Sequence, residues 1–162
     1  MNYKMIVFDA DDTLRYCTVP GQPCPNDHGQ WALLPKVKEV LAKIDWGKPE
    51  DGKVALGIAS NQGGIALNYF TKQKAFEILR ETAIVATGYK LDDDDVQFCH
   101  HHPHSGCSCR KPKPLMLQRL LKKYNLRPTE LLFVGDRDTD EECAINAGCD
   151  FKYAKDFFGW EK

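Results

Sequence analysis

Two carboxylates one residue apart, Asp9 and Asp11, follow directly on the apolar stretch 5–8. Alternate residues of an extended chain lie on one face, so both carboxylates could point into the same crevice. Like charges that close together need a cation, or one of them must hold a proton. The pair therefore indicates a metal site or an acid–base site, and a strand that simply ends in an acidic turn is the structural alternative.

Polar side chains also follow two later apolar stretches. Ser60 and Asn61 come after residues 53–59, and Asp136 and Asp140 follow a further stretch. In an open parallel sheet, ligands bind beyond the carboxyl ends of the strands. Carboxylates gathered there would hold a hard cation such as Mg²⁺ through oxygen ligands. A hydroxyl, a lysine and backbone N–H groups would hold phosphate oxygens at the same edge.

Soft metal ligands are concentrated in residues 99–109, and they are Cys99, His101, Cys107 and Cys109. Thiolate and imidazole select Zn²⁺ over hard cations, and four such ligands close a tetrahedral structural site. We expect one structural zinc in this loop, and a histidine-rich surface loop with reduced cysteines is the alternative. The metal would pin the segment that carries the neighbouring basic pair, Arg110 and Lys111.

Composition limits the classes of protein. The 162 residues are 43% hydrophobic and 28% charged, with a formal net charge of −1, which suits one globular domain over residues 1–162. The small net charge gives no support for nucleic acid or an anionic membrane as a partner. No apolar run approaches the ~20 residues of a membrane-spanning helix, and the N-terminus lacks a signal-peptide pattern. Seven cysteines, three of them beside histidines, favour metal binding over disulfides. We expect a cytoplasmic monomer.

The elements that must position these side chains alternate along the chain. Short apolar stretches that end in turns predict strands at 5–8, 53–59, 96–98, 131–134 and 151–153. Helical patterns separate them and begin at Pro35, after Thr71, at Pro114 and at residue 140. This alternation predicts a three-layer α/β fold with a doubly wound, Rossmann-like parallel sheet.

Capping residues mark the bounds of two of these helices. Thr71 is expected to cap the second helix, which should end at Gly88. Thr139 and Glu142 have the spacing of a capping box for a helix over residues 140–147.

Three segments fall outside the strands and helices. Residues 15–34 are long and rich in proline and glycine, which predicts a loop that could help cover the site. The acidic run 92–95 is expected to be a solvated turn. The aromatic tail 157–160 is expected to dock on the core.

Four motifs occur in order, each placed after an expected strand. They are DxDxT at residues 9–13, the hydroxyl of Ser60, the lysine of Arg110-Lys111-Pro112, and GDxxxD at residues 135–140. From Ile6 to Gly148 the chain thereby resembles the haloacid dehalogenase (HAD) superfamily of phosphotransferases. The resemblance implies that the α/β fold is HAD-like.

The resemblance also implies a role for each matched side chain. Asp9 would attack phosphorus and form an aspartyl-phosphate. Asp11 would protonate the leaving oxygen and then take a proton from the attacking water. Ser60 and Lys111 would stabilise charge on the transferring phosphoryl group. Asp140 would orient Lys111.

The same resemblance implies a catalytic Mg²⁺ held by Asp9, by the backbone carbonyl of Asp11 and by Asp136. Asp138 is expected to lie beside the site or to face solvent. Position 12 is often glycine in related enzymes and is aspartate here, which alters the local charge but not the nucleophile.

The cysteine–histidine segment narrows the resemblance. It carries CxHxP at residues 99–103 and CxCRKP at residues 107–112. These motifs resemble HAD subfamily IIIA, the histidinol-phosphate and D-glycero-D-manno-heptose-1,7-bisphosphate phosphatases. The resemblance implies a structural zinc and no large cap domain, so loops would set selectivity at an open site. Asn61 and Arg110 are the candidate substrate contacts.

Three functions are consistent with these residues, two of them phosphatases and the third a domain without catalysis. The first is an Mg²⁺-dependent phosphomonoesterase that acts on a small phosphorylated metabolite through an aspartyl-phosphate. The second is a polynucleotide 3′-phosphatase, because residues 20–34 resemble the corresponding loop of those enzymes. Nucleic acid is not the favoured partner, since the net charge is −1 and Trp31 suits a core position better than a base-stacking platform. The third is a non-catalytic domain with the same fold, which would not need all of the matched residues.

Overall fold

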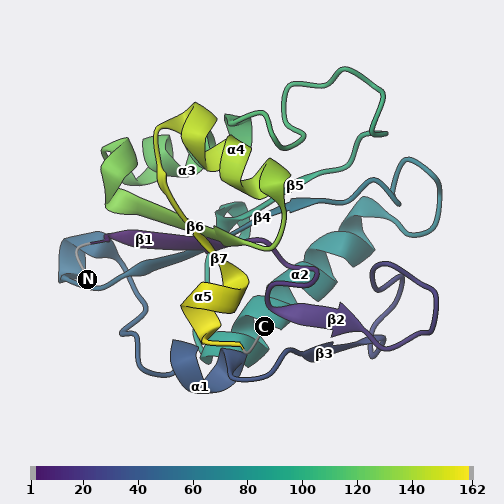
Figure 1. Cartoon of the computed structure of the whole chain (residues 1–162), viewed down its shortest axis with the longest axis horizontal. Helices are drawn as coiled ribbons and strands as arrows, with labels where there is room; N and C mark the ends of the chain where they lie inside the picture. Colours follow the sequence, from purple (N-terminus) through teal and green to yellow (C-terminus); the bar gives the residue numbers. More distant parts are fainter. Residues whose placement is uncertain (1–2, 161–162) are drawn as a thin grey trace.

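The computed structural model describes residues 3–160. A central sheet has five parallel strands in the order β5-β4-β1-β6-β7 (Figure 1). Its strands are β1 (Met5–Phe8), β4 (Ala55–Asn61), β5 (Val96–Cys99), β6 (Leu131–Gly135) and β7 (Asp150–Tyr153). Two further strands, β2 (Arg15–Cys17) and β3 (Trp31–Leu33), form a separate antiparallel pair.

Helices cover both faces of the sheet. They are α1 (Val37–Leu41), α2 (Lys72–Thr87), α3 (Leu115–Tyr124), α4 (Asp138–Ala147) and α5 (Ala154–Phe158). In Figure 1, α3 and α4 lie above the sheet and α1, α2 and α5 lie below it. The expected three-layer, doubly wound parallel fold is therefore confirmed, and residues 3–160 include no large cap domain.

The central strand β1 shows why two cores form. All four of its side chains are fully buried, and they point alternately to the two faces. Ile6 and Phe8 pack with α1, α2 and α5, whereas Met5 and Val7 pack with α3 and α4. Phe8 is in register with a residue of β4 and a residue of β6, so the polar residues that follow these strands lie at the same edge of the sheet.

The segment 15–34 differs from the expected loop, because its ends pair as the β2–β3 hairpin. Strands of three residues are too short to show an alternating pattern among prolines and glycines. Trp31 is half-buried in this hairpin and lies outside both hydrophobic clusters, so its expected core position is wrong. The first helix begins at Val37 rather than at Pro35, because Lys36 adopts the left-handed conformation (φ 65°).

The expected capping box of Thr139 and Glu142 is wrong. Helix α4 begins at Asp138, so Thr139 lies within its first turn. Asp140 provides the cap instead, since its Oδ2 accepts hydrogen bonds from the backbone N–H groups of Asp136 and Arg137, both at 3.1 Å. By contrast, Thr71 does cap α2, accepting from the backbone N–H of Lys74 at 3.1 Å.

The acidic run 92–95 is not a solvated turn throughout. Its last three residues form a 3₁₀ turn in which the side chain of Asp95 is buried. Asp95 accepts hydrogen bonds from Lys123 Nζ at 2.9 Å and from the Tyr124 hydroxyl at 2.7 Å. A carboxylate with two such donors can be buried without leaving an unpaired charge.

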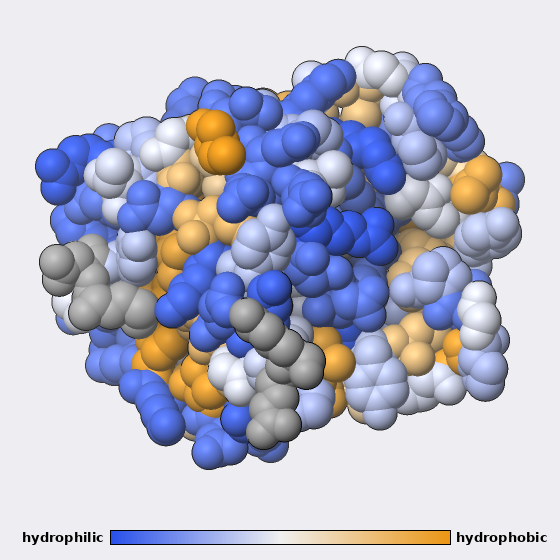
Figure 2. Space-filling model, in the orientation of Figure 1, coloured by the Kyte–Doolittle hydropathy of each residue, from blue (hydrophilic) through white to orange (hydrophobic). Residues whose placement is uncertain are grey.

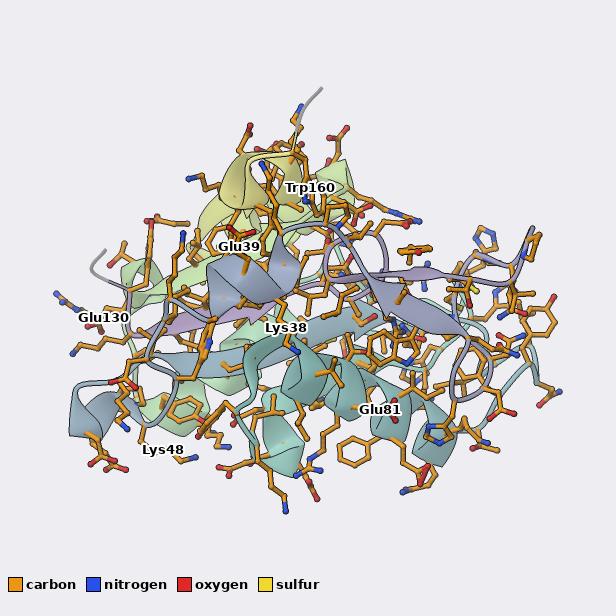
Figure 3. The ribbon with its side chains drawn as sticks, turned by 90° about the horizontal axis from the view of Figure 1, so that it is seen from below. Lys38, Glu39, Lys48, Glu81, Glu130 and Trp160 are labelled. Carbon is orange, nitrogen blue, oxygen red and sulfur yellow. The ribbon has the colours of Figure 1, made fainter. Side chains whose placement is uncertain are left out.

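The aromatic tail packs on the core as expected. Phe158 is 2% exposed and stacks on Phe8 with ring centroids 6.2 Å apart. Trp160 Nε1 donates a hydrogen bond to the backbone carbonyl of Pro35 at 2.6 Å, and Figure 3 shows Trp160 at the end of α5, on the side of α1. Within residues 3–160, every helix is too short or too polar to span a lipid bilayer.

Candidate active site

The loops that follow β1, β4, β5 and β6 gather at one end of the sheet, on the right in Figure 1. A cleft of about 280 Å³ opens there. The sequence-predicted residues that line it are Asp9, Asp11, Asn61, Arg110, Lys111 and Asp140. Side chains from segments more than 100 residues apart therefore meet at one edge, as parallel topology requires.

A carboxylate cluster lies at the bottom of this cleft. Oxygens of Asp9, Asp136 and Asp140 all lie within 4.8 Å of one another. The ammonium of Lys111 contacts Asp9 Oδ1 at 2.9 Å and Asp140 Oδ1 at 2.7 Å, and it donates to the backbone carbonyl of Ala59 at 2.9 Å. Three carboxylates and one ammonium leave a formal charge of −2 in the cluster.

Burial dominates the electrostatics of this cluster. Burial raises the pKa of Asp9 well above its ordinary value, and the Lys111 ammonium opposes that shift. Burial alone would lower the pKa of Lys111, but the carboxylates of Asp9 and Asp140 raise it above its ordinary value. Lys111 is therefore a fixed positive charge at the base of the cleft.

Asp11 lies on the cleft wall and is held by two donors that the sequence did not reveal. Its Oδ1 accepts from Arg15 Nε at 2.8 Å, and its Oδ2 accepts from Gln62 Nε2 at 3.1 Å. Both donor residues are buried, and Arg15 also donates to Thr82 Oγ1 at 3.0 Å. No local signal could have found this network, because Gln62 and Thr82 come from segments distant in the sequence.

Ser60 and Asn61, at the end of β4, also form hydrogen bonds. Ser60 Oγ accepts a hydrogen bond from Gln62 Nε2 at 2.7 Å, which leaves the serine's own O–H free to donate elsewhere. Asn61 Oδ1 accepts from the backbone N–H of Lys111 at 3.0 Å, and Asn61 Nδ2 donates to the Lys111 carbonyl at 3.3 Å. Asn61 therefore holds the backbone of Lys111 in place, although it also lines the cleft.

Arg110 presents a donor to the cleft. Its Nη1 is buried and, within residues 3–160, has no hydrogen-bond partner. A buried, unpaired guanidinium N–H is costly unless an acceptor joins it. Asp138, in contrast, is exposed and accepts from the Tyr153 hydroxyl at 2.7 Å, away from the carboxylate cluster.

The four predicted zinc ligands come together at the end of β5. The sulfur of Cys99 lies 3.6 Å from that of Cys107, which lies 3.9 Å from that of Cys109. Nδ1 of His101 lies 3.4 Å from the Cys99 sulfur and 3.2 Å from the Cys109 sulfur. Around zinc, a tetrahedron of such ligands has S···S edges of about 3.8 Å and S···N edges of about 3.6 Å. The observed spacings fit that geometry.

This cluster also connects the end of β5 to the basic segment. Cys99 and Cys109 are buried, and Lys111 follows Cys109 by two residues. His102 and His104 are exposed and lie outside this ligand set. A metal here would join two chain segments that border the cleft.

The chain is similar to known phosphatases of one family. A family profile described as HAD-hydrolase-like matches residues 108–152. The D-glycero-beta-D-manno-heptose-1,7-bisphosphate 7-phosphatase of Pseudomonas aeruginosa is 30% identical over 152 residues, which span 92% of this chain and 79% of that protein. The chain belongs to the HAD-like hydrolases. Within this family it is related to the heptose-bisphosphate and HisB phosphatases, so the resemblance seen in the sequence is confirmed.

Other relatives of this HAD-like hydrolase match to different extents. The bifunctional histidine biosynthesis protein HisB of Blochmanniella floridana is 32% identical over 164 residues, which span 100% of this chain but 44% of that protein. The heptose-bisphosphate phosphatase of Helicobacter pylori J99 matches over 93 residues, so the aligned region covers only 52% of its length. The crystal structure of the D,D-heptose 1,7-bisphosphate phosphatase of B. bronchiseptica, complexed with magnesium and phosphate, has a TM-score of 0.71, with 24% identity and coverage of 91% of this chain and 78% of that one. This structural likeness establishes the fold.

Proposed function

We propose that this HAD-like hydrolase is an Mg²⁺-dependent phosphomonoesterase that acts on a small phosphorylated metabolite through an aspartyl-phosphate. The observation that carries the proposal is the cluster of Asp9, Asp136 and Asp140 around the Lys111 ammonium at the bottom of an open cleft. A non-catalytic domain would have no reason to bury two carboxylates beside a third with a single ammonium.

The residues present fit a divalent cation. Their donors are all oxygens, and the formal charge of −2 on the cluster matches the charge of Mg²⁺. Asp9, Asp136 and the backbone carbonyl of Asp11 would hold the ion. When bound, Mg²⁺ would supply neutralising charge for the carboxylates and for the phosphoryl oxygens.

The chain's own residues would carry out two displacement steps. In the first, the Asp9 carboxylate attacks phosphorus and the ester P–O bond breaks, while Asp11 gives a proton to the leaving oxygen. In the second, water attacks phosphorus of the aspartyl-phosphate and gives its proton to Asp11, which regenerates Asp9 and releases phosphate. Lys111 and the free O–H of Ser60 would donate to the phosphoryl oxygens in both steps.

Gln62 would set the geometry of two of these groups. Its amide N–H groups donate to Asp11 Oδ2 and Ser60 Oγ. Once Asp11 has given up its proton it can only accept hydrogen bonds, so the nitrogen end of the amide would face it in that state. The same amide then leaves the O–H of Ser60 free to donate.

The cysteine–histidine cluster would hold a structural Zn²⁺. Four ligands at tetrahedral spacing leave no open position for substrate. The ion would keep Arg110 and Lys111 at the cleft, because Cys109 precedes them directly. Arg110, whose Nη1 has no partner among the described residues, would contact an anionic oxygen of the substrate.

The relatives suggest the substrate class. They act on a heptose bisphosphate or belong to histidine biosynthesis, so a sugar phosphate or a histidinol-phosphate type of ester is the proposed substrate. The polynucleotide alternative gains no support, since Trp31 is half-buried in the β2–β3 hairpin rather than displayed in the cleft.

A panel of phosphate esters, assayed with Mg²⁺ and with EDTA, tests the function. We expect the wild type to release phosphate only with Mg²⁺, and the near-isosteric variant Asp9→Asn to lose turnover by several orders of magnitude. An Asp9→Asn variant as active as the wild type would disprove the nucleophile. Wild-type protein inactive on the whole panel would favour the non-catalytic alternative.

A further inference from the structure

The loop after β4 presents two large apolar side chains beside the cleft. The backbone N–H of Tyr69 donates to the Gly64 carbonyl at 2.9 Å, which closes a compact turn. The ring of Phe70 packs against Gly64, where an added Cβ would lie only 2.6 Å from the ring. Because Phe70 is buried beneath the turn, its neighbour Tyr69 faces outward and is 62% exposed. Leu67 from the same turn is 46% exposed, and both residues line the cleft.

A second part of the cleft wall is also held in place by internal contacts. Pro23 and Cys24 line it, within the connection between β2 and β3. Gln22 Nε2 donates to the Cys24 carbonyl at 2.7 Å and to Gln30 Oε1 at 2.9 Å. This connection is further tied to α2, where Lys74 Nζ contacts Asp27 at 2.9 Å. This part of the wall is therefore held by hydrogen bonds within the connection and by an ion pair to α2.

The cleft continues past these residues. A second hollow of about 310 Å³ adjoins it, and the two share Pro23, Cys24 and Tyr69 in their linings. Figure 2 shows apolar residues among hydrophilic ones at the right-hand end of the molecule, where these loops gather. A molecule with its phosphate at Lys111 that extends into the second hollow would pass Tyr69 and Pro23, which line both.

The two neutral side-chain amides that line the cleft are already hydrogen-bonded within the protein. The amide of Asn61 is bonded to the backbone of Lys111, and the amide of Gln62 to Asp11 and Ser60. An alcohol rich in hydroxyl groups would find few neutral partners here, whereas a flat ring would bury its faces against Tyr69 and Pro23.

Resting on the phosphomonoesterase function above, we propose that Tyr69, Leu67 and Pro23 form a subsite for a planar aromatic or heteroaromatic ring in the alcohol part of the substrate. Tyr69 is the specificity-determining residue, and the ring lies between the phosphate position and the second hollow. Polyhydroxylated esters bind this subsite less well than ring-bearing esters of the same chain length.

The test compares 2-phenylethyl phosphate with glycerol 3-phosphate. Both have primary alkyl leaving groups, so the ratio of their kcat/KM values reports binding of the ring rather than leaving-group ability. We expect the wild type to prefer the phenylethyl ester. Tyr69→Ala should lower that preference about three- to tenfold by raising KM for the ring-bearing ester alone, with kcat unchanged. Tyr69→Phe should retain the preference.

Tyr16 provides a matched control, because it is 43% exposed and lies outside both linings. Tyr16→Ala should leave the ratio unchanged. A wild type that turns over glycerol 3-phosphate at least as well as the ring-bearing ester would overturn the subsite while leaving the phosphatase function intact. An equal loss on both esters in Tyr69→Ala would also overturn it. Inactivity of the wild type on both esters and on p-nitrophenyl phosphate would instead remove the function on which the subsite rests.

Discussion

The geometry of the carboxylate cluster predicts that Asp136→Asn stabilises the protein without Mg²⁺ and makes it less stable than the wild type with Mg²⁺. Asp136→Asn removes one of three close negative charges, and the amide keeps an oxygen that can accept the hydrogen bond from Thr13 Oγ1. At the 4.8 Å limit of the cluster, two unit charges repel by about 3.5 kcal/mol at an effective dielectric constant of about 20. The Asp136 side chain is 21% exposed and Lys111 offsets part of the repulsion, so we expect a gain of about 1 kcal/mol in EDTA.

With Mg²⁺ the wild type should become the more stable of the two proteins. An ion at 100 times its dissociation constant stabilises the wild type by about 2.7 kcal/mol, which raises Tm by about 5–10 °C for a chain of this length. Asp136→Asn loses a ligand and one negative charge, so most of that rise should disappear. The assay is thermal unfolding followed by circular dichroism, with EDTA and with a titration of Mg²⁺.

Asp138→Asn is the matched control, because Asp138 is two residues away and exposed. It should show the full Mg²⁺-dependent rise. The ion-binding assignment is refuted if Asp136→Asn keeps the wild-type response, or if Asp138→Asn loses it.

Three other predictions test separate parts of the site and the fold. Elemental analysis should find about one zinc per chain, and Cys107→Ser should lose both zinc and activity; an active, zinc-free wild type would contradict this. Gln62→Met should lower kcat/KM more for alkyl than for aryl phosphates, because a mispositioned Asp11 matters most for poor leaving groups, and a uniform loss would count against that role. The backbone N–H of Arg127 and the Lys4 ammonium lower the pKa of Glu130 from 4.5 to about 2. Glu130 therefore stabilises the fold above pH 4.5 and loses this effect as the pH falls toward 2, so Tm of Glu130→Gln should depend less on pH in that interval, and an unchanged dependence would contradict it.

Much of the fold and the placing of the acids could be predicted because the signals are local. A buried strand such as β1 is apolar on both faces, and Asp9 directly after it marks the edge of the sheet. The same holds for β6 and Asp136. The cysteine–histidine cluster could also be predicted from the sequence, because its four residues lie within eleven positions of one another.

The features that could not be predicted depend on contacts between distant segments, or on which of two neighbouring residues caps a helix. The partners of Asp11 include Gln62, which is 51 residues away in the sequence. The sequence near either residue does not indicate this hydrogen bond. Thr139 and Asp140 are both plausible at the start of α4, and the carboxylate prevails because it accepts from two backbone N–H groups at once. The β2–β3 hairpin was missed because its two strands have only three residues each, too few to show an alternating pattern.

The most direct measurement is to identify the covalent intermediate. Enzyme quenched during turnover of a phosphate ester with Mg²⁺ is reduced with borohydride, which converts an aspartyl-phosphate to homoserine, and its peptides are analysed by mass spectrometry. We expect homoserine in place of Asp9 in the wild type, and unmodified peptides when the substrate or Mg²⁺ is left out. Modification of a different residue would contradict Asp9 as the nucleophile, and so would sustained turnover with position 9 never modified.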